Sequence, residues 1–163
     1  MAMTTVYLAL GSNVGDSRRH IQQAAGLLGE VLRSLKQAPV YSSKAVGYTD
    51  QPDFLNTAVS GQTDLEPEVL LEQIKNIENQ VGRTPTFHHG PREIDIDIIF
   101  YGDKILETEA LTIPHPDFRE RDFVLQPVCD LNSSLIDPVT KQTAGQLLAS
   151  IKTSQKSLIR QVD

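Results

Sequence analysis

Residues 88–102, HHGPREIDIDIIFYG, carry the pattern on which both the expected fold and the expected site depend. From Ile94 to Ile98 apolar and acidic residues alternate, which is the period of a β-strand with one buried face. Asp95 and Asp97 would then point to the same side of a sheet, with side chains based roughly 7 Å apart. Two such carboxylates raise each other's pKa unless a cation lies between them, so a divalent ion, above all Mg²⁺, is the expected ligand. The alternative is a half-exposed strand whose outer face carries charge only for solubility.

The residues around this strand favour a site for a metal-bound polyphosphate. Arg92 follows Gly90 and Pro91 directly before the strand, and a guanidinium suits phosphate oxygens. Four arginines flank the aspartate pair in the sequence: Arg83, Arg92, Arg119 and Arg121. Surface ion pairs with nearby acidic residues, each worth under about 1 kcal/mol, are the alternative explanation for that cluster. A zinc site at His88 and His89 is disfavoured, because adjacent residues of an extended chain face opposite ways.

The composition narrows the class of protein. The chain has 163 residues, of which 39% are hydrophobic and 22% charged, so a single globular domain spanning residues 1–163 is expected. The net charge of −6 argues against broad nucleic-acid or anionic-membrane binding. Cys129 is the only cysteine, which excludes a disulfide framework and fits a cytoplasmic location. No apolar run is long enough for a membrane span, and the N-terminal residues predict a strand rather than a signal peptide.

The predicted elements follow the order β-α-β-β-α-β, which is the ferredoxin-like arrangement of the α+β class. Strands are expected at residues 4–10, 39–43 and 54–61, with a fourth from residue 94 onward. The first helix is expected to begin at an N-cap, Asp16 or Ser17, and to end near Ser34. Asp64 is expected to cap the second helix, which ends at Val81. In this arrangement both helices cover one face of an antiparallel sheet, and the other face is free to carry a site.

Two further segments have local signals. The glycine-bearing turn at residues 11–17 lacks the Gly-Lys-Ser/Thr ending of a phosphate-binding loop, so a tight turn before a helix cap is the favoured interpretation. At the C-terminus, a helix from a cap at Thr143 to Ile151 and an edge strand at residues 157–162 are expected additions to the fold. Residues 103–142 have no pattern that predicts a helix or a strand.

Taken together, these segments resemble the 6-hydroxymethyl-7,8-dihydropterin pyrophosphokinase family of the folate pathway, along the chain to about residue 130. The most specific matching segments are Gly90-Pro91-Arg92 followed by Ile94-Asp95-Ile96-Asp97, and Pro114-His115-Pro116 with Arg121 and Phe123. Further matching segments are Leu10-Gly11-Ser12-Asn13, residues 50–56 (DQPDFLN), and Ile77-Glu78 with Gly82-Arg83.

The resemblance implies a reaction in which the terminal diphosphate of ATP passes to the hydroxymethyl oxygen of the dihydropterin, with release of AMP. It implies that Asp95 and Asp97 bind two Mg²⁺ ions, and that Arg83 and Arg92 join them as catalytic residues. The residues expected to bind ATP are Arg83, Arg92, Ile98, Thr112, His115 and Arg121. The residues expected to bind the pterin are Ser43, Lys44, Val46, Phe54, Asn56, Asp95 and Phe123. The resemblance also suggests association with other folate-pathway enzymes.

The chain departs from the usual pattern of the family in residues 84–89, where many members have a longer loop with a second arginine and a tryptophan. Here Arg83 stands alone and His89 takes the place of the tryptophan, so weaker clamping of phosphate is expected. Residues 44–52 and 84–90 would be the lids that close over the substrates. Two alternatives stay open: a non-catalytic ferredoxin-like binding domain, and a Mg²⁺-dependent nucleotide hydrolase.

Overall fold

Strand β1 (Thr4–Ser12) lies at the centre of the sheet and pairs antiparallel with β4 (Phe54–Thr63) on one side and β5 (Asp95–Tyr101) on the other. The computed structural model describes residues 2–162, and its six-stranded sheet has the order β5-β1-β4-β3-β8, with β2 also paired to β4. The other strands are β2 (Arg33–Gln37), β3 (Val40–Ser43) and β8 (Leu158–Val162), and β6 (Leu106–Glu107) pairs with β7 (Thr112–Ile113) in a small second sheet.

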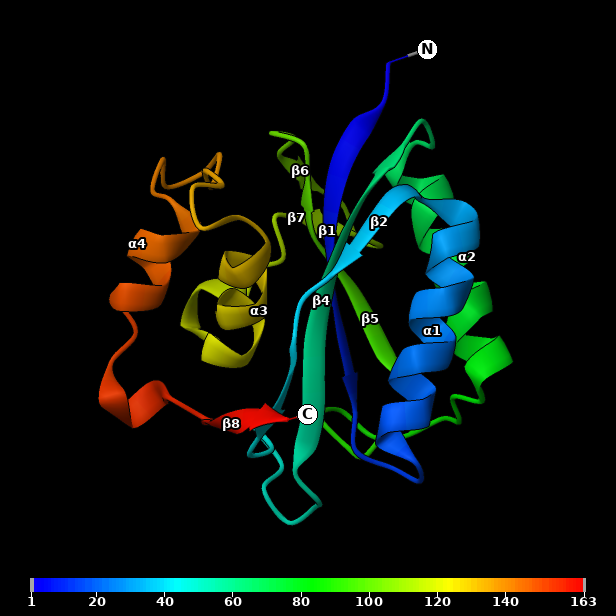
Figure 1. Ribbon diagram of the computed structural model, residues 1–163, viewed down its shortest axis with the longest axis vertical. Coiled ribbons are helices and arrows are strands. Elements are labelled where there is room, and N and C mark those ends of the chain that lie inside the picture. The colour runs from blue at the N-terminus through cyan, green and yellow to red at the C-terminus, as the bar shows by residue number, and fades with distance from the viewer. Residues whose placement is uncertain (1, 163) are drawn as a thin grey trace.

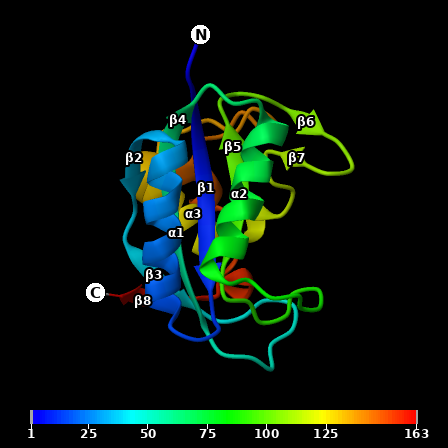
Figure 2. The same cartoon turned by 90° about the vertical axis from the view of Figure 1, so that its right-hand side faces the viewer.

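Helices cover both faces of the large sheet (Figure 1). They are α1 (Ser17–Val31), α2 (Pro67–Val81), α3 (Asp122–Asn132) and α4 (Ala144–Ala149), with 3₁₀ turns η1 (Phe118–Glu120) and η2 (Thr153–Gln155). Helices α1 and α2 lie side by side over one face (Figure 2), and α3 and α4 lie on the opposite side. The strand order and the placement of α1 and α2 confirm the ferredoxin-like α+β prediction.

The side chains of β1 alternate between two hydrophobic cores. Val6 and Leu8, both 0% exposed, belong to the core under α1 and α2. Tyr7 points the other way and packs with Phe100 in the core under α3 and α4. The expectation that this second face would be free is therefore wrong for part of the sheet, because these apolar side chains need their own cover. The uncovered part lies toward the ends of β1 and β5 that carry Gly11 and the two aspartates.

The first helix is shorter than expected, and a strand that was not predicted follows it. Helix α1 ends at Val31 rather than Ser34, because Leu32 already has extended backbone angles (φ −107°, ψ 144°). Strand β2 then pairs with β4 although Leu35 is its only apolar residue. A polar edge strand of this kind has no alternating pattern of apolar residues, so the sequence does not distinguish it from the end of the helix.

The predicted cap of the second helix is also wrong. The N-cap of α2 is Glu66, not Asp64, and its side chain makes no capping hydrogen bond. Pro67 determines this start, because proline fits the first helical position and keeps the residue before it extended. Glu66 has the corresponding angles, φ −64° and ψ 154°.

Helix α3 lies in the region that received no assignment. Its apolar residues Val124, Leu125 and Val128 have helical spacing and are buried, but Pro127 lies inside the helix and obscures the pattern. The other predicted caps are confirmed: Asp16 accepts from the Arg19 N–H at 3.2 Å, and Thr143 caps α4. The C-terminal edge strand is confirmed as β8, which pairs with β3.

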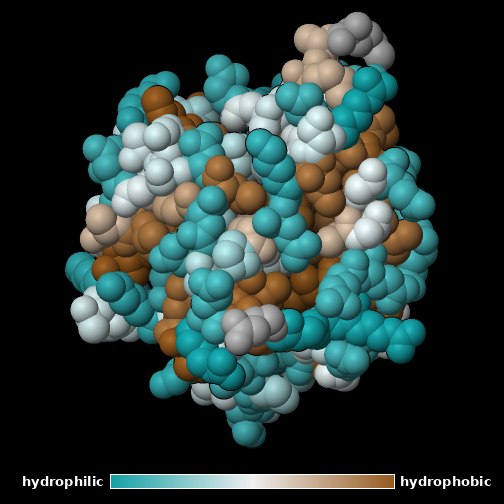
Figure 3. Space-filling model, in the orientation of Figure 1, coloured by the Kyte–Doolittle hydropathy of each residue, from teal (hydrophilic) through white to brown (hydrophobic). Residues whose placement is uncertain are grey.

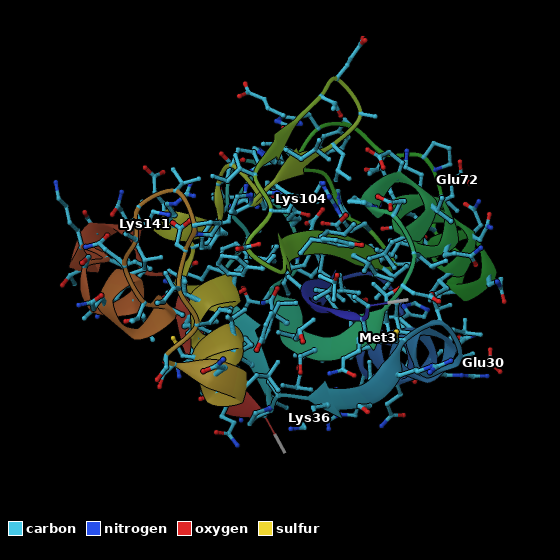
Figure 4. The ribbon with its side chains drawn as sticks, turned by 90° about the horizontal axis from the view of Figure 1, so that it is seen from above. Met3, Glu30, Lys36, Glu72, Lys104 and Lys141 are labelled. Atoms are coloured by element: carbon cyan, nitrogen blue, oxygen red, sulfur yellow. The ribbon has the colours of Figure 1, made fainter. Side chains whose placement is uncertain are left out.

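The outer surface is a mixture of polar and apolar residues (Figure 3). Viewed from above, Glu30 of α1 and Glu72 of α2 lie on the outer sides of their helices (Figure 4), and both are exposed. No helix within residues 2–162 combines the length and the hydropathy that crossing a membrane requires.

Arg119 belongs to the scaffold rather than to the arginine cluster that the sequence suggested. Its guanidinium makes two bonds to Asp137, at 2.6 and 3.0 Å, and the Asp137 side chain is 0% exposed. Asp137 also accepts from the Val139 N–H and the Thr140 hydroxyl. These donors lower the pKa of Asp137 although burial opposes them, and the pair ties η1 to the segment before α4.

We predict that Asp137→Asn lowers the free energy of unfolding at pH 7 by roughly 1.5–3 kcal/mol, the range for hydrogen bonds to a charged group. Since the folded pKa lies below the unfolded one, this stabilisation is present above about pH 4 and is lost as the pH falls through the folded pKa. Urea unfolding at several pH values measures it, with the exposed Asp64→Asn as the control. An equal loss at pH 7 and at the lowest pH would contradict the assignment.

Candidate active site

Asp95 and Asp97 lie on the face of β5 that points away from α1 and α2. The isoleucines that alternate with them are buried in the α1/α2 core: Ile94, Ile96 and Ile98. The spacing therefore predicts the shared face correctly. Across the sheet the two aspartates pair with Gly11 and Ala9 of β1, whose small side chains leave space above the strands.

Arginines hold one of the two carboxylates. Arg83 Nη1 lies 3.1 Å from Asp95 Oδ1, and Arg92 Nη1 lies 3.3 Å from Asp95 Oδ2. The same Arg83 nitrogen lies 2.7 Å from Glu78 Oε2, which also accepts the Ile96 N–H at 2.9 Å. Burial raises the pKa of Glu78, although the Ile96 N–H and Arg83 oppose this shift. Glu78 thus joins α2, β5 and the arginine in one network.

Asp97 differs from its neighbour because none of the ion pairs within residues 2–162 includes it. Burial raises the pKa of Asp97 well above its usual range, and the nearby Asp95 carboxylate raises it further. A half-buried carboxylate without a paired cation beside another carboxylate is a favourable place for a bound cation.

Two pockets meet at Asp97. The first has a volume of about 650 Å³ and the second about 600 Å³, and both are open to solvent. The first is lined by Ala9, Leu10, Gly11, Ser43, Lys44, Val46, Phe54, Asn56, His89, Arg92, Asp95, Asp97, Arg121, Phe123 and Val124. The second is lined by Leu71, Ile96, Asp97, Ile98, Glu109, Ala110, Leu111, Thr112, His115 and Pro116. Asp97 is the one residue that these two sets share.

The first pocket brings together all seven residues expected to bind the pterin. Phe54 at the start of β4 and Phe123 at the start of α3 supply aromatic surface from separate elements. Asn56 Nδ2 donates to Ser43 Oγ at 2.6 Å. Gly11 pairs with Asn56 on one side and with Asp95 on the other, so the amide and the carboxylate lie on one row across the sheet, about 10 Å apart along it.

The residues expected to bind ATP are divided between the two pockets. Ile98, Thr112 and His115 line the second pocket, whereas Arg92 and Arg121 line the first. The remaining expected residue, Arg83, lines neither of these two pockets and reaches the site through its contact with Asp95.

His115 is held in one orientation at the edge of β5. The backbone N–H of His115 donates to the Ile99 carbonyl at 3.1 Å. The ring Nδ1 accepts the backbone N–H of Asp117 at 3.2 Å. Burial lowers the pKa of His115, and Arg121 lowers it further. With Nδ1 used as an acceptor, the neutral ring carries its proton on Nε2, which can donate a hydrogen bond to an anionic ligand.

Hydrogen bonds join the two expected lids to each other and to Asn13, the residue after β1. Asn13 Nδ2 donates to Gln51 Oε1 at 2.8 Å, and Asn13 Oδ1 accepts the Arg92 N–H at 2.9 Å. Gln51 Nε2 in turn donates to the His89 carbonyl at 2.7 Å. The prediction that His88 and His89 face opposite ways is wrong: His89 has a φ of 59°, and the centroids of the two rings lie 3.8 Å apart.

Sequence reasoning missed the supporting residues. Asn13 and Glu78 are 5% and 7% exposed, and each bonds partners far away in the sequence. Both lie in segments that match the family, which was the one available signal. Glu109 in the second pocket had no signal, because the surrounding segment has no regular pattern.

The donor set fits Mg²⁺. Within residues 2–162, no three His, Cys, Asp or Glu side chains gather in a way that could hold a metal ion. Asp95 and Asp97 could contribute two carboxylates from one face of β5. Mg²⁺ is commonly bound by one or two carboxylates, with water and substrate phosphates completing its coordination.

Comparison with known proteins identifies the family. The family model described as 7,8-dihydro-6-hydroxymethylpterin-pyrophosphokinase (HPPK) matches residues 7–133. The chain belongs to this family. Membership of HPPK supports pyrophosphokinase activity in folate biosynthesis, in agreement with the expectation from the sequence motifs.

Relatives of HPPK include proteins of similar length and longer ones. The 2-amino-4-hydroxy-6-hydroxymethyldihydropteridine pyrophosphokinase of Aquifex aeolicus is 44% identical over 140 residues, which cover 86% of this chain and 88% of that protein. The folic acid synthesis protein fol1 of Pneumocystis carinii is 43% identical over 136 residues, 83% of this chain but only 18% of that protein. A solved HPPK-DHPS of Plasmodium falciparum shares the fold, with a TM-score of 0.71 at 17% identity over 91% of this chain and 44% of that one.

We predict that Glu78→Gln lowers kcat by roughly ten- to a hundredfold, because Arg83 loses the charge that holds it beside Asp95. The matched control is Glu72→Gln, an exposed change on the same helix. Steady-state assays of AMP formation measure both variants, with circular dichroism to show that each is folded. A Glu78→Gln enzyme as active as the control would mean that the network does not serve the reaction.

Proposed function

We propose that this chain transfers the diphosphoryl group of ATP to the hydroxymethyl oxygen of 6-hydroxymethyl-7,8-dihydropterin, and that this reaction depends on Mg²⁺ bound by Asp95 and Asp97. The observation that carries the proposal is that Asp97 lines both pockets. One pocket suits the acceptor and the other the nucleotide, so their junction is where a group would pass between them.

The first pocket suits a flat heterocycle with polar edges. Phe54 and Phe123 offer aromatic faces, and face-to-face contact with a planar ring is favourable when offset. Asn56 can donate and accept, which matches the alternating donors and acceptors of a pterin edge. Ser43 and Lys44, at the end of β3, complete that side of the pocket.

The second pocket suits the nucleoside part of ATP, with its phosphates directed toward Asp97. Ile98 and Thr112 give a mixed apolar and polar wall, and His115 presents its Nε2–H. Arg92 and Arg121 line the neighbouring pocket on the other side of Asp97. Their guanidinium groups can donate to phosphate oxygens as charge builds up during transfer.

Mg²⁺ bound at Asp95 and Asp97 would supply charge stabilisation and alignment of the phosphates. The carboxylates would hold it, and Arg83, fixed by Glu78, would limit how far Asp95 can turn. Closure of the joined loops at residues 44–52 and 84–90 would exclude water, which favours transfer to the pterin over hydrolysis.

The relatives support a proposal about the wider setting of this chain. We propose a single pyrophosphokinase unit in the cytoplasm, acting on small molecules rather than on nucleic acid or membranes. The solved Plasmodium falciparum protein is named HPPK-DHPS, so its name joins HPPK to a second unit, DHPS. That fusion supports association of this chain with other enzymes of folate biosynthesis.

We predict that Asp97→Ala lowers the rate of AMP formation by about a hundredfold or more, since a catalytic metal contributes several kcal/mol. Binding of the dihydropterin, measured by fluorescence, should stay close to that of the wild type, because its other contacts remain. Asp103→Ala, an exposed change after the same strand, is the control.

Product analysis separates this reaction from others. The proposal requires AMP that forms only when the dihydropterin and Mg²⁺ are both present. ADP or inorganic phosphate formed without the pterin would indicate a nucleotide hydrolase, and near-normal AMP formation by Asp97→Ala would refute the metal assignment.

A further inference from the structure

A buried aspartate near the first pocket is satisfied almost entirely by the C-terminal segment. Asp122 is 2% exposed and lies between Arg121 and Phe123, both of which line the first pocket. The Ser157 N–H lies 3.1 Å from both Asp122 carboxylate oxygens, and the Ser157 hydroxyl donates to Oδ1 at 3.1 Å. The Leu158 N–H donates to Oδ2 at 3.0 Å.

These donors matter because Asp122 forms no ion pair within the described residues. A buried carboxylate without a cation is costly unless hydrogen bonds replace its water. Its position at the start of α3 helps, since the helix dipole favours a negative charge there. The remaining compensation comes from Ser157 and Leu158, so the C-terminal segment is fixed to the first turn of α3.

The same segment also bonds a second wall of the pocket, at the end of β3. The Ser157 carbonyl accepts the Lys44 N–H at 2.8 Å. Leu158 then pairs with Ser43 at the end of β3. Ser43 and Lys44 line the same pocket as Phe123 of α3.

Ser157 is therefore a direct link between the two walls of the pocket. Its N–H and hydroxyl bond the α3 wall, and its carbonyl bonds the β3 wall. Figure 2 shows β8 beside β3, with which it pairs. Ser157 is only 9% exposed, so water does not compete freely for these bonds.

We propose that Ser157, acting through Asp122, is a positioning residue for the dihydropterin: it holds the Phe123 wall at a fixed distance from the Ser43–Lys44 wall. The HPPK model ends at residue 133, so this segment lies outside the part of the chain by which the family is recognised. The inference rests on the proposed function, because the width of the pocket matters only if a flat ring binds there.

The test is the binding of 6-hydroxymethyl-7,8-dihydropterin to the full-length protein, followed by fluorescence. Ser157→Ala should raise the Kd for the dihydropterin about three- to tenfold, because the lost hydrogen bond lies within the protein and only part of its free energy is felt at the pocket. Asp122→Asn removes the charge that orders all these donors, and it should raise the Kd further. The matched control is Ser154→Ala, an exposed change in η2.

A split between kinetic constants separates positioning from a general loss of stability. In both variants KM for the dihydropterin should rise, while KM for ATP and kcat at saturating dihydropterin stay within about twofold of the wild type. Thermal unfolding measures the fraction of each variant that is folded at the assay temperature. The Kd values are then corrected for that fraction.

Unchanged dihydropterin affinity in Ser157→Ala and Asp122→Asn would overturn the inference, even if both variants unfold at a lower temperature. Equal losses of ATP and dihydropterin binding would overturn it as well. A wild-type protein that binds no dihydropterin would instead refute the proposed function, so the two failures are distinguishable.

Discussion

The repulsion between two carboxylates on one face of β5 is the constraint around which this structure is arranged. Arg83 and Arg92 compensate the charge of Asp95, whereas Asp97 has no ion-pair partner within residues 2–162. This asymmetry leaves a carboxyl group without an ion-pair partner at the place where the two pockets meet. A strand at the edge of the sheet is well suited to this role, because one side chain can border pockets on two sides.

Buried polar side chains, rather than the hydrophobic cores, give the site its shape. Glu78 joins α2 to β5 and to Arg83, and Asn13 joins the end of β1 to the segment before β5. Asp122 does the same for α3 and the C-terminal segment. Buried groups of this kind are costly when unpaired, so each one specifies a single arrangement of the elements that it connects.

The sequence predicted those features of the fold that depend on neighbouring residues, such as the face of a strand or the cap of a helix. The alternation at residues 94–98 placed both aspartates on one face, and Asp16 and Thr143 cap their helices as expected. Strand β2 and helix α3 were missed, because polar edge pairing and Pro127 leave no regular pattern. Arg119 was placed wrongly because nearness in sequence to the site says nothing about its bond to Asp137. The partners of Glu78 and Asp122 come from distant segments, which one sequence does not pair.

The most direct test of the metal assignment is calorimetric titration of a non-hydrolysable ATP analogue into the wild type and into Asp97→Asn, with and without Mg²⁺. The wild type should bind the analogue much more tightly when Mg²⁺ is present, and the variant should lose most of that difference. Equal affinities with and without Mg²⁺ in the wild type, or an unchanged Mg²⁺ effect in Asp97→Asn, would contradict the account.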